Sequence, residues 1–267
     1  MQFIYLAGLG FLCMYLLQGK IQRMLAEAGQ VVKNYKGNDI PSMMGISLIF
    51  SVLVAATIWF VLQGGREPSF LYIIFGCAFM GLVGTLDDVI GNHESKGFKG
   101  HISNFLKGKV TTGVLKMLAA AVVAGSMSIV ISDSILAIIM NFLLISLVTN
   151  FINLLDTRPG RAIKGFLIIT ILSILIRQIL AIHAIVIGAI LAYWPIDLSA
   201  KGMLGDTGAN FLGIVLGISL AMQNNMWVKG AYVFIFLFLN LASEKVSFSK
   251  VIEKNTALRF LDQIGRK

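Results

Sequence analysis

Residues 135–161 read ILAIIMNFLLISLVTNFINLLDTRPGR, an apolar run that ends in polar and charged residues. The first part of this stretch, 135–152, contains no Asp, Glu, Lys or Arg. A helix needs about 20 predominantly apolar residues to cross the hydrocarbon core of a bilayer. The stretch therefore predicts a transmembrane helix whose polar end lies at the membrane surface.

The composition of the whole chain agrees with this reading. Of the 267 residues, 57% are hydrophobic and only 13% are charged, whereas about 25% of the residues in a soluble domain are charged. The chain has too few polar groups to shield this much apolar surface from water. Its surroundings are therefore expected to be lipid. We predict an all-α, polytopic integral membrane protein with about nine transmembrane helices. The candidate spans are 1–18, 43–63, 70–86, 112–132, 135–152, 165–177, 179–194, 208–223 and 227–243.

Basic residues are distributed unevenly between the two sides of these spans. With the N-terminus outside, 19 of the 22 Lys and Arg residues fall on the cytosolic side, and only Arg66, Arg177 and Lys229 fall outside. Cytosolic loops of membrane proteins carry an excess of Lys and Arg. We therefore predict an outside N-terminus, a cytosolic C-terminus and a functional site on the cytosolic face. The net charge of +9 is attributed to this orientation and to anionic ligands, not to nucleic acid.

The chain has no long linker, so we expect one membrane-embedded domain, 1–267, that ends in a cytosolic tail, 244–267. Apolar residues recur among the lysines of this tail at Phe248, Val251, Ile252, Leu258, Leu261 and Ile264. Such a pattern is typical of an amphipathic helix that lies on a membrane surface. A disordered basic tail is the alternative.

Two adjacent carboxylates, Asp87 and Asp88, close the third span on the cytosolic side. Carboxylates at the end of a span are costly unless they are solvated, paired or bound to a metal. Adjacent carboxylates also repel each other, which raises one pKa or recruits a cation. The pair is a candidate catalytic site, and ordinary solvation of a helix end is the alternative.

A second polar cluster closes the fifth span. Asn153 and Asp156 are three residues apart and share one face of a helix, and Arg158 and Arg161 follow around a Pro-Gly turn. Carboxamide, carboxylate and guanidinium groups together suit a sugar or phosphate bound with a metal. The alternative is an interfacial turn with ordinary cytosolic arginines.

A third cluster, Gly205-Asp206-Thr207-Gly208, opens the eighth span. Glycines allow a close backbone approach, and a helix N-terminus favours phosphate. Taken alone, the cluster is equally explained as a helix N-cap.

Together the three clusters are stronger evidence for a functional site than any one of them, because they lie at the cytosolic ends of different spans. A basic segment with Lys107, Lys109 and Lys116 belongs to the same side. In phosphoryl transfer, metal-binding carboxylates neutralise phosphate charge and lysines hold phosphate oxygens. The combined pattern therefore predicts phosphoryl transfer.

The order of these motifs resembles that of the polyprenyl-phosphate N-acetylhexosamine-1-phosphate transferase superfamily. The order is Asp-Asp, then Asn-x-x-Asp, then Gly-Asp-x-Gly. Residues 40–45, Ile-Pro-Ser-Met-Met-Gly, are similar to the family's Pro-Thr-Met-Gly-Gly motif, and residues 204–208, Leu-Gly-Asp-Thr-Gly, to its Met-Gly-Asp-Thr-Gly motif. The resemblance covers nearly the whole chain.

This resemblance implies a reaction and its partners. A polyprenyl phosphate such as undecaprenyl phosphate attacks the sugar-linked phosphate of a nucleotide-sugar, which is expected to be UDP-linked. A nucleoside monophosphate leaves, and a polyprenyl-diphosphate-sugar stays in the membrane for cell-envelope glycan assembly. The resemblance also implies a bacterial plasma membrane and allows a homodimer.

By position in the motifs, the resemblance also assigns roles to individual residues. Asp206 and Asp87 are expected to bind Mg²⁺, and Asp87, Asp88 and Asp156 to be the catalytic carboxylates. The expected substrate-binding residues are Ser42 and Asn153 of these motifs, together with Lys109 and Lys116 of the basic segment and Arg158 and Arg161 of the second cluster. Because a phosphate monoester is largely dianionic at neutral pH, the assignment of Asp87 as a general base is a hypothesis.

The chain departs from the family pattern where relatives recognise their donor. Pro159 replaces the second aspartate of Asn-x-x-Asp-Gly-x-Asp-Gly, which is associated with uracil recognition, and Ile196 replaces an asparagine ahead of Asp206. The family's late histidine-rich loop is missing, because the tail contains no histidine. The nucleotide and the sugar therefore stay open.

Other functions remain as alternatives. One is a catalytically degenerate homologue that binds lipid-linked substrate without turnover. Another is a membrane transporter, although the acidic clusters lie on one face and no pathway through the outer half is marked except by Asp133. A CDP-alcohol phosphatidyltransferase needs a fuller aspartate array than Gly160-Arg161-Ala162 offers.

Overall fold

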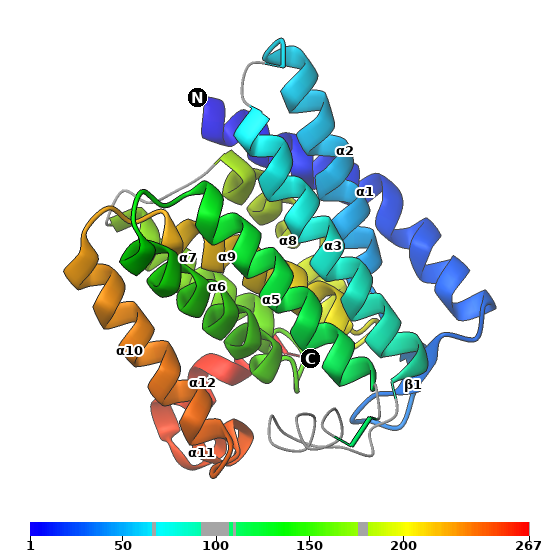
Figure 1. The fold of residues 1–267 in the computed structure, drawn as a ribbon. Helices are drawn as coiled ribbons and strands as arrows, with labels where there is room; N and C mark the ends of the chain where they lie inside the picture. Colours follow the sequence, from blue (N-terminus) through cyan, green and yellow to red (C-terminus); the bar gives the residue numbers. More distant parts are fainter. Residues whose placement is uncertain (66–67, 92–106, 109–110, 176–180, 267) are drawn as a thin grey trace.

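The computed structural model describes residues 1–65, 68–91, 107–108, 111–175 and 181–266. Within these residues the long helices run side by side as one bundle (Figure 1). The helices are α1 (Gln2–Glu27), α2 (Gly45–Leu62), α3 (Pro68–Ile90), α5 (Thr112–Val130), α6 (Ile135–Leu155), α7 (Arg161–Leu175), α8 (Ala181–Leu198), α9 (Gly205–Ala221), α10 (Met226–Ser243), α11 (Phe248–Lys254) and α12 (Thr256–Gln263). The predicted helical class is confirmed.

Several long helices begin at a polar residue that caps their first turn. The hydroxyl oxygens of Thr111 and Ser134 each accept a hydrogen bond at 3.3 Å from the backbone N–H three residues later. The carboxamide oxygen of Asn225 accepts two such bonds at the start of α10. N-cap side chains satisfy backbone donors that a helix leaves free, so these apolar helices start where the sequence places Thr, Ser or Asn.

Seven helices of the described part are long and apolar enough to cross a membrane: α1, α2, α3, α5, α6, α8 and α10. Helix α9 is apolar but shorter, and α7 has 15 residues. Each of the nine predicted spans falls largely on one of these nine helices. The chain is a multi-pass membrane protein, as predicted, whereas the number of crossings and the orientation stay predictions.

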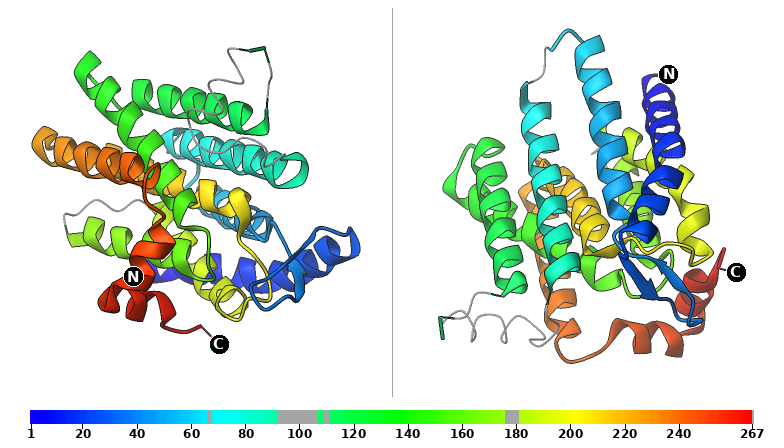
Figure 2. Two further views of the ribbon diagram at one scale, coloured as in Figure 1. Left: turned by 90° about the horizontal axis from the view of Figure 1, so that it is seen from below. Right: turned by 90° about the vertical axis from the view of Figure 1, so that its right-hand side faces the viewer.

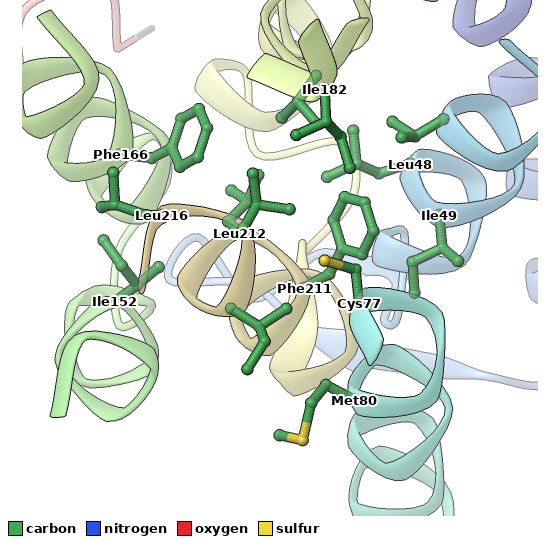
Figure 3. Packing of buried hydrophobic residues seen from close by; sticks show 14 of the residues in the cluster. Leu48, Ile49, Cys77, Met80, Ile152, Phe166, Ile182, Phe211, Leu212 and Leu216 are labelled. Atoms are coloured by element: carbon green, nitrogen blue, oxygen red, sulfur yellow. The ribbon is translucent and has the colours of Figure 1, made fainter. Parts of the chain in front are cut away.

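Helix α9 lies within the bundle and contacts α2, α3, α6 and α7. Of its 17 residues, all except Asp206 are buried. Figure 3 shows Phe211, Leu212 and Leu216 of α9 among side chains of the surrounding helices. A helix that is apolar on every side needs apolar neighbours all round. The enclosed α9 is therefore a firm support for Asp206 in its first turn.

Glycines let two neighbouring backbones approach α9 closely. A Cβ built on Gly45 of α2 would lie 2.1 Å from the backbone nitrogen of Gly208. A Cβ built on Gly213 would lie 2.6 Å from the Cα of Thr149 in α6. Small residues at helix crossings are the usual means of tight packing in lipid, so these glycines fix the distance from α9 to α2 and α6.

The short elements gather at one end of the bundle, opposite the N-terminus (Figure 2). The strands β1 (Val31–Lys33) and β2 (Asp39–Pro41) form an antiparallel hairpin there, with Val32 opposite Ile40. Helices α11 and α12 lie at the same end. The hairpin was not predicted, because strands of three residues are too short to show an alternating pattern.

The expected tail helix is divided into α11 and α12 at Asn255, whose side chain caps α12 by accepting from the backbone N–H of Leu258 at 3.0 Å. Several apolar tail side chains are exposed, among them Val251, Leu258 and Leu261. This agrees with an amphipathic surface element, but its contact with a membrane stays a prediction.

Candidate active site

Four helices bring one polar side chain each to a common point. These are Asp87 of α3, Lys116 of α5, Asn153 of α6 and Asp206 of α9. The ammonium nitrogen of Lys116 lies 3.1 Å from Oδ2 of Asp87 and also contacts Oδ2 of Asp206. We call these four residues the acid–lysine centre.

Asn153 completes the centre from α6. With its carboxamide oriented to satisfy both neighbours, the nitrogen donates to Oδ1 of Asp206 at 3.0 Å and the oxygen accepts from Nζ of Lys116 at 3.2 Å. A lysine ammonium has three donors, and Lys116 has one oxygen from each of three residues to receive them. The centre is thus a closed hydrogen-bonded group with two carboxylates and one cation.

Asp88 faces a different group from its neighbour Asp87. Its Oδ1 accepts from the backbone N–H of Asp206 at 3.0 Å, and its Oδ2 accepts from the backbone N–H of Thr207 at 2.9 Å. The Thr207 hydroxyl also donates to Oδ2 at 2.7 Å. A carboxylate at a helix N-terminus satisfies free backbone donors and favours the helix dipole. Asp88 therefore caps α9 from α3.

The backbone of this cap has no room for side-chain atoms. Gly205 has φ of 74°, a left-handed conformation that favours glycine. A Cβ on Gly205 would lie 2.7 Å from Oδ2 of Asp88, and a Cβ on Gly84 would lie 2.6 Å from the carbonyl oxygen of Asp206. The Gly-Asp-x-Gly and Gly-x-x-x-Asp spacings therefore have a structural cause, which is the close approach of α3 to α9.

Asp156 lies directly after α6, beside the acid–lysine centre. Burial raises the pKa of Asp156 well above its ordinary value, and the charges of Asp197, Asp206 and Asp88 raise it further. Its Oδ2 is buried and has no hydrogen-bond partner among the described residues. A buried oxygen without a partner is costly, so Asp156 is a candidate for contact with a bound substrate.

Asp197 of α8 was missed by sequence reasoning. It is only 5% exposed, and its Oδ2 accepts from the backbone N–H of Gly160 at 2.7 Å. Asp197 thereby holds the turn that follows Asp156. A single acid near the end of an apolar span was the available signal, because such a residue is expensive in a membrane unless it has a partner.

The two arginines of the second cluster face the C-terminal tail. Arg161 is 5% exposed and forms a bidentate pair with Asp262 of α12, with Nε to Oδ1 at 2.9 Å and Nη2 to Oδ2 at 3.0 Å. Arg158 is more exposed and lies 3.9 Å from Glu253 of α11. The structure thus places Arg161 in the tail contact and leaves the Arg158 side chain 42% exposed.

The other two predicted substrate-binding residues, Ser42 and Lys109, are not members of the acid–lysine centre. Ser42 lies just after β2, where its hydroxyl donates to the carbonyl oxygen of Gln30 at 3.3 Å. Its segment is tied to the start of α9, because Met44 N–H donates to the carbonyl oxygen of Met203 at 2.8 Å. Lys109 lies outside the described residues.

Two hollows lie at the end of the bundle that carries the short elements. The larger, about 500 Å³, lies between the end of α1, the hairpin and residues 199–201. The smaller, about 220 Å³, lies between the tail and the turn after Asp156 and is lined by Tyr35, Arg158 and Arg259, among others. In the walls of both hollows basic residues outnumber acidic ones, so both favour anionic groups.

The donor atoms of the acid–lysine centre fit Mg²⁺ in kind. Magnesium prefers oxygen ligands and is usually held by one or two carboxylates together with substrate phosphates. Asp87 and Asp206 supply two carboxylates and Asn153 a carboxamide oxygen, and Lys116 shows that this oxygen group attracts a cation. The described residues contain no group of three or more His, Cys, Asp or Glu that could bind a metal. A metal at this centre would therefore also need the Asn153 oxygen and oxygens of the substrate.

Comparison with known proteins agrees with these motifs. No protein-family model matches the chain. The chain is 23% identical to the phospho-N-acetylmuramoyl-pentapeptide-transferase of Chlorobaculum tepidum over 256 residues, a match that covers 82% of this chain and 68% of that protein. This similarity supports the resemblance of the chain to the polyprenyl-phosphate N-acetylhexosamine-1-phosphate transferase superfamily, as a distant relative. The resemblance inferred from the superfamily motifs is thereby confirmed, while the roles of individual site residues stay predictions.

Proposed function

We infer that the protein is a membrane phosphotransferase that moves a sugar-1-phosphate from a nucleotide-sugar to a polyprenyl phosphate. The observation that carries this inference is the convergence of Asp87, Lys116, Asn153 and Asp206 from four helices. The distant similarity to phospho-N-acetylmuramoyl-pentapeptide-transferase supports the same chemistry. Undecaprenyl phosphate is the first acceptor to test and UDP-sugars are the first donors, with a product that serves cell-envelope glycan assembly.

In the proposed reaction, an oxygen of the lipid phosphate attacks the phosphorus that carries the sugar. A P–O bond forms there, and the bond from this phosphorus to the oxygen that bridges to the nucleotide breaks. The bridging oxygen leaves with the electron pair as part of the nucleoside monophosphate. Because a phosphate monoester has a second pKa of about 6, most attacking oxygens carry no proton at neutral pH. Charge neutralisation and alignment are then the main tasks of the protein.

The acid–lysine centre suits these tasks. Asp87, Asp206 and the Asn153 carboxamide would hold Mg²⁺, which when bound neutralises developing charge on the phosphate oxygens. Lys116 has a flexible stem and a compact charge, so it is placed to hold a non-bridging phosphate oxygen beside these residues.

The donor is proposed to lie along the turn that follows Asp156. The accessible guanidinium of Arg158 and the side chain of Arg259 face the 220 Å³ hollow together with the ring of Tyr35. Two cations and an aromatic ring suit the diphosphate and base of a nucleotide. The excess of Lys and Arg in the same segments supports a cytosolic position for this end of the bundle.

The direct test uses purified protein in detergent with Mg²⁺, undecaprenyl phosphate and a panel of UDP-, CDP- and GDP-sugars. Chromatography measures the nucleoside monophosphate that is released and the sugar that enters the lipid fraction. The proposal predicts equal amounts of both with at least one donor, and neither without lipid. Saturable lipid binding without release by any donor supports a degenerate homologue instead, and ion flux into liposomes without metal supports a transporter.

A further inference from the structure

The ammonium group of Lys116 occupies the meeting point of the three oxygen ligands proposed for Mg²⁺. It contacts one oxygen of Asp87, one of Asp206 and the carboxamide oxygen of Asn153. Only about a fifth of the Lys116 side chain is exposed, and that of Asp87 is 18% exposed. The lysine is thus a largely enclosed counter-charge that contacts residues of three other helices.

Removal of this cation would leave two carboxylates close together. Like charges in a partly desolvated site repel strongly, because the effective dielectric constant is far below that of water. Lys116 therefore stabilises the convergence of α3, α6 and α9 in the structure as it stands. The same oxygens cannot also serve a divalent cation fully while the ammonium group uses one from each residue.

We propose that Lys116 competes with the divalent cation for the oxygens of Asp87, Asp206 and Asn153, and leaves them when the cation binds. This inference rests on the proposed magnesium-dependent function. Lys116 keeps the site assembled beforehand and then turns its four-carbon stem toward a phosphate oxygen of the substrate. Phosphate binding and metal binding are thereby coupled through one side chain, which makes Lys116 a positioning residue as well as a substrate contact.

The first test measures Mn²⁺ binding by electron paramagnetic resonance, with no substrate present. The variants are Lys116→Met, Lys116→Arg and Asp206→Asn, with Lys254→Met as a control that removes one exposed lysine from the tail. We expect Lys116→Met to bind Mn²⁺ at least about tenfold more tightly than wild type. Lys116→Arg and Lys254→Met should stay close to wild type, and Asp206→Asn should lose the site.

A second measurement uses the wild-type protein alone, so it does not depend on the folding of any variant. An amine-reactive reagent labels lysines, and mass spectrometry compares Lys116 with the exposed Lys254. The proposal predicts that Mn²⁺ raises labelling of Lys116 severalfold and leaves Lys254 unchanged.

The outcomes separate the competition from the metal centre itself. If Asp206→Asn does not reduce Mn²⁺ binding, the proposed metal centre is wrong. If Mn²⁺ binding depends on Asp206 but is equal or weaker in a folded Lys116→Met protein, the competition is overturned and the metal centre survives. Labelling of Lys116 that is unaffected by saturating Mn²⁺ also overturns the competition.

Discussion

Asp88 accepts hydrogen bonds from the backbone N–H groups of Asp206 and Thr207, at 3.0 and 2.9 Å, with its two carboxylate oxygens. The adjacent Asp87 instead contacts Lys116 of the acid–lysine centre. Two neighbouring acids of one motif therefore have separate structural tasks. Asp88 fixes the backbone of Asp206, and Asp87 is a member of the acid–lysine centre together with Asp206.

This division predicts different consequences for substitutions at Asp88. Asp88→Ala should lower the free energy of unfolding by about 1–3 kcal/mol, because buried N–H groups lose their acceptor. Asp88→Asn keeps one oxygen acceptor, so its free energy of unfolding should lie between those of Asp88→Ala and wild type. Its turnover should be restored in part at high Mg²⁺. Thermal unfolding in detergent and turnover at increasing Mg²⁺ measure the two effects. An Asp88→Asn enzyme as inactive as Asp206→Asn at every Mg²⁺ concentration would show that Asp88 takes part in the chemistry.

Substitution of Asp87 should act on turnover more than on stability. Asp87→Asn removes one charge from the acid–lysine centre while keeping the shape of the side chain. We expect turnover to fall by about 100-fold or more, with a higher requirement for Mg²⁺, because phosphate charge is less well neutralised. Steady-state kinetics at several Mg²⁺ concentrations measures this. Near-wild-type turnover of Asp87→Asn would remove Asp87 from both its metal and its base roles.

The close approach of α3 and α9 predicts that two glycines resist enlargement. Gly84→Ala places a Cβ 2.6 Å from the carbonyl oxygen of Asp206. Gly205→Ala forces an alanine into the left-handed conformation that Gly205 adopts, with φ of 74°. Each should destabilise the protein by about 1–3 kcal/mol and shift Asp206. Gly125→Ala in α5 is the matched control, because a Cβ there meets nothing within 4 Å and should stabilise by about 0.5–1 kcal/mol. Equal melting temperatures for Gly84→Ala and Gly125→Ala would contradict the packing.

The tail contact predicts a dependence on acid. Burial opposes the charge of Asp262, but hydrogen bonds and charges from Arg161 and Arg266 lower its pKa below the ordinary value of 3.8. Because the pKa is lower in the docked state, the contact stabilises the tail above about pH 4 and the stabilisation is lost as the pH falls below that. Hydrogen exchange of α12, corrected for the intrinsic pH dependence of amide exchange, should show weaker protection of the tail as the pH falls below about 4.

Asp262→Asn provides the control for that measurement. It leaves Arg161 buried without its charge partner, which typically costs about 3–5 kcal/mol, so the tail should already be released at pH 7 and show no further step. An Asp262→Asn tail that is as well protected as the wild-type tail at pH 7 would contradict the role of this pair.

The sequence predicted the helical fold and most members of the centre for one physical reason. Acidic and amide residues at the ends of apolar runs are expensive in a membrane, so Asp87, Asn153 and Asp206 stand out without any knowledge of the fold. Lys116 was included as one of several lysines near the acids. Its place between two carboxylates depends on the packing of α5 against α3 and α6, which no local pattern reveals.

Other features depend on contacts between distant segments. The pairing of Arg161 with Asp262 joins residues about a hundred positions apart, so the sequence could suggest only that Arg161 was a cytosolic or substrate-binding arginine. Asp197 was missed because its partner is a backbone N–H of Gly160, which no sequence pattern reveals. Asp88 was grouped with Asp87 because adjacent carboxylates look alike until the helix that each one faces is known.

A donor with two labels shows directly whether the sugar and its phosphate are transferred together. A nucleotide-sugar carries ³²P in the phosphate attached to a ¹⁴C sugar, and is incubated with undecaprenyl phosphate, Mg²⁺ and either wild-type protein or Asp206→Asn. If a sugar-1-phosphate is transferred at the acid–lysine centre, both labels enter the lipid in equal amounts with wild type and neither does with Asp206→Asn. Transfer of the sugar without its phosphorus, or equal transfer by Asp206→Asn, would contradict this proposal.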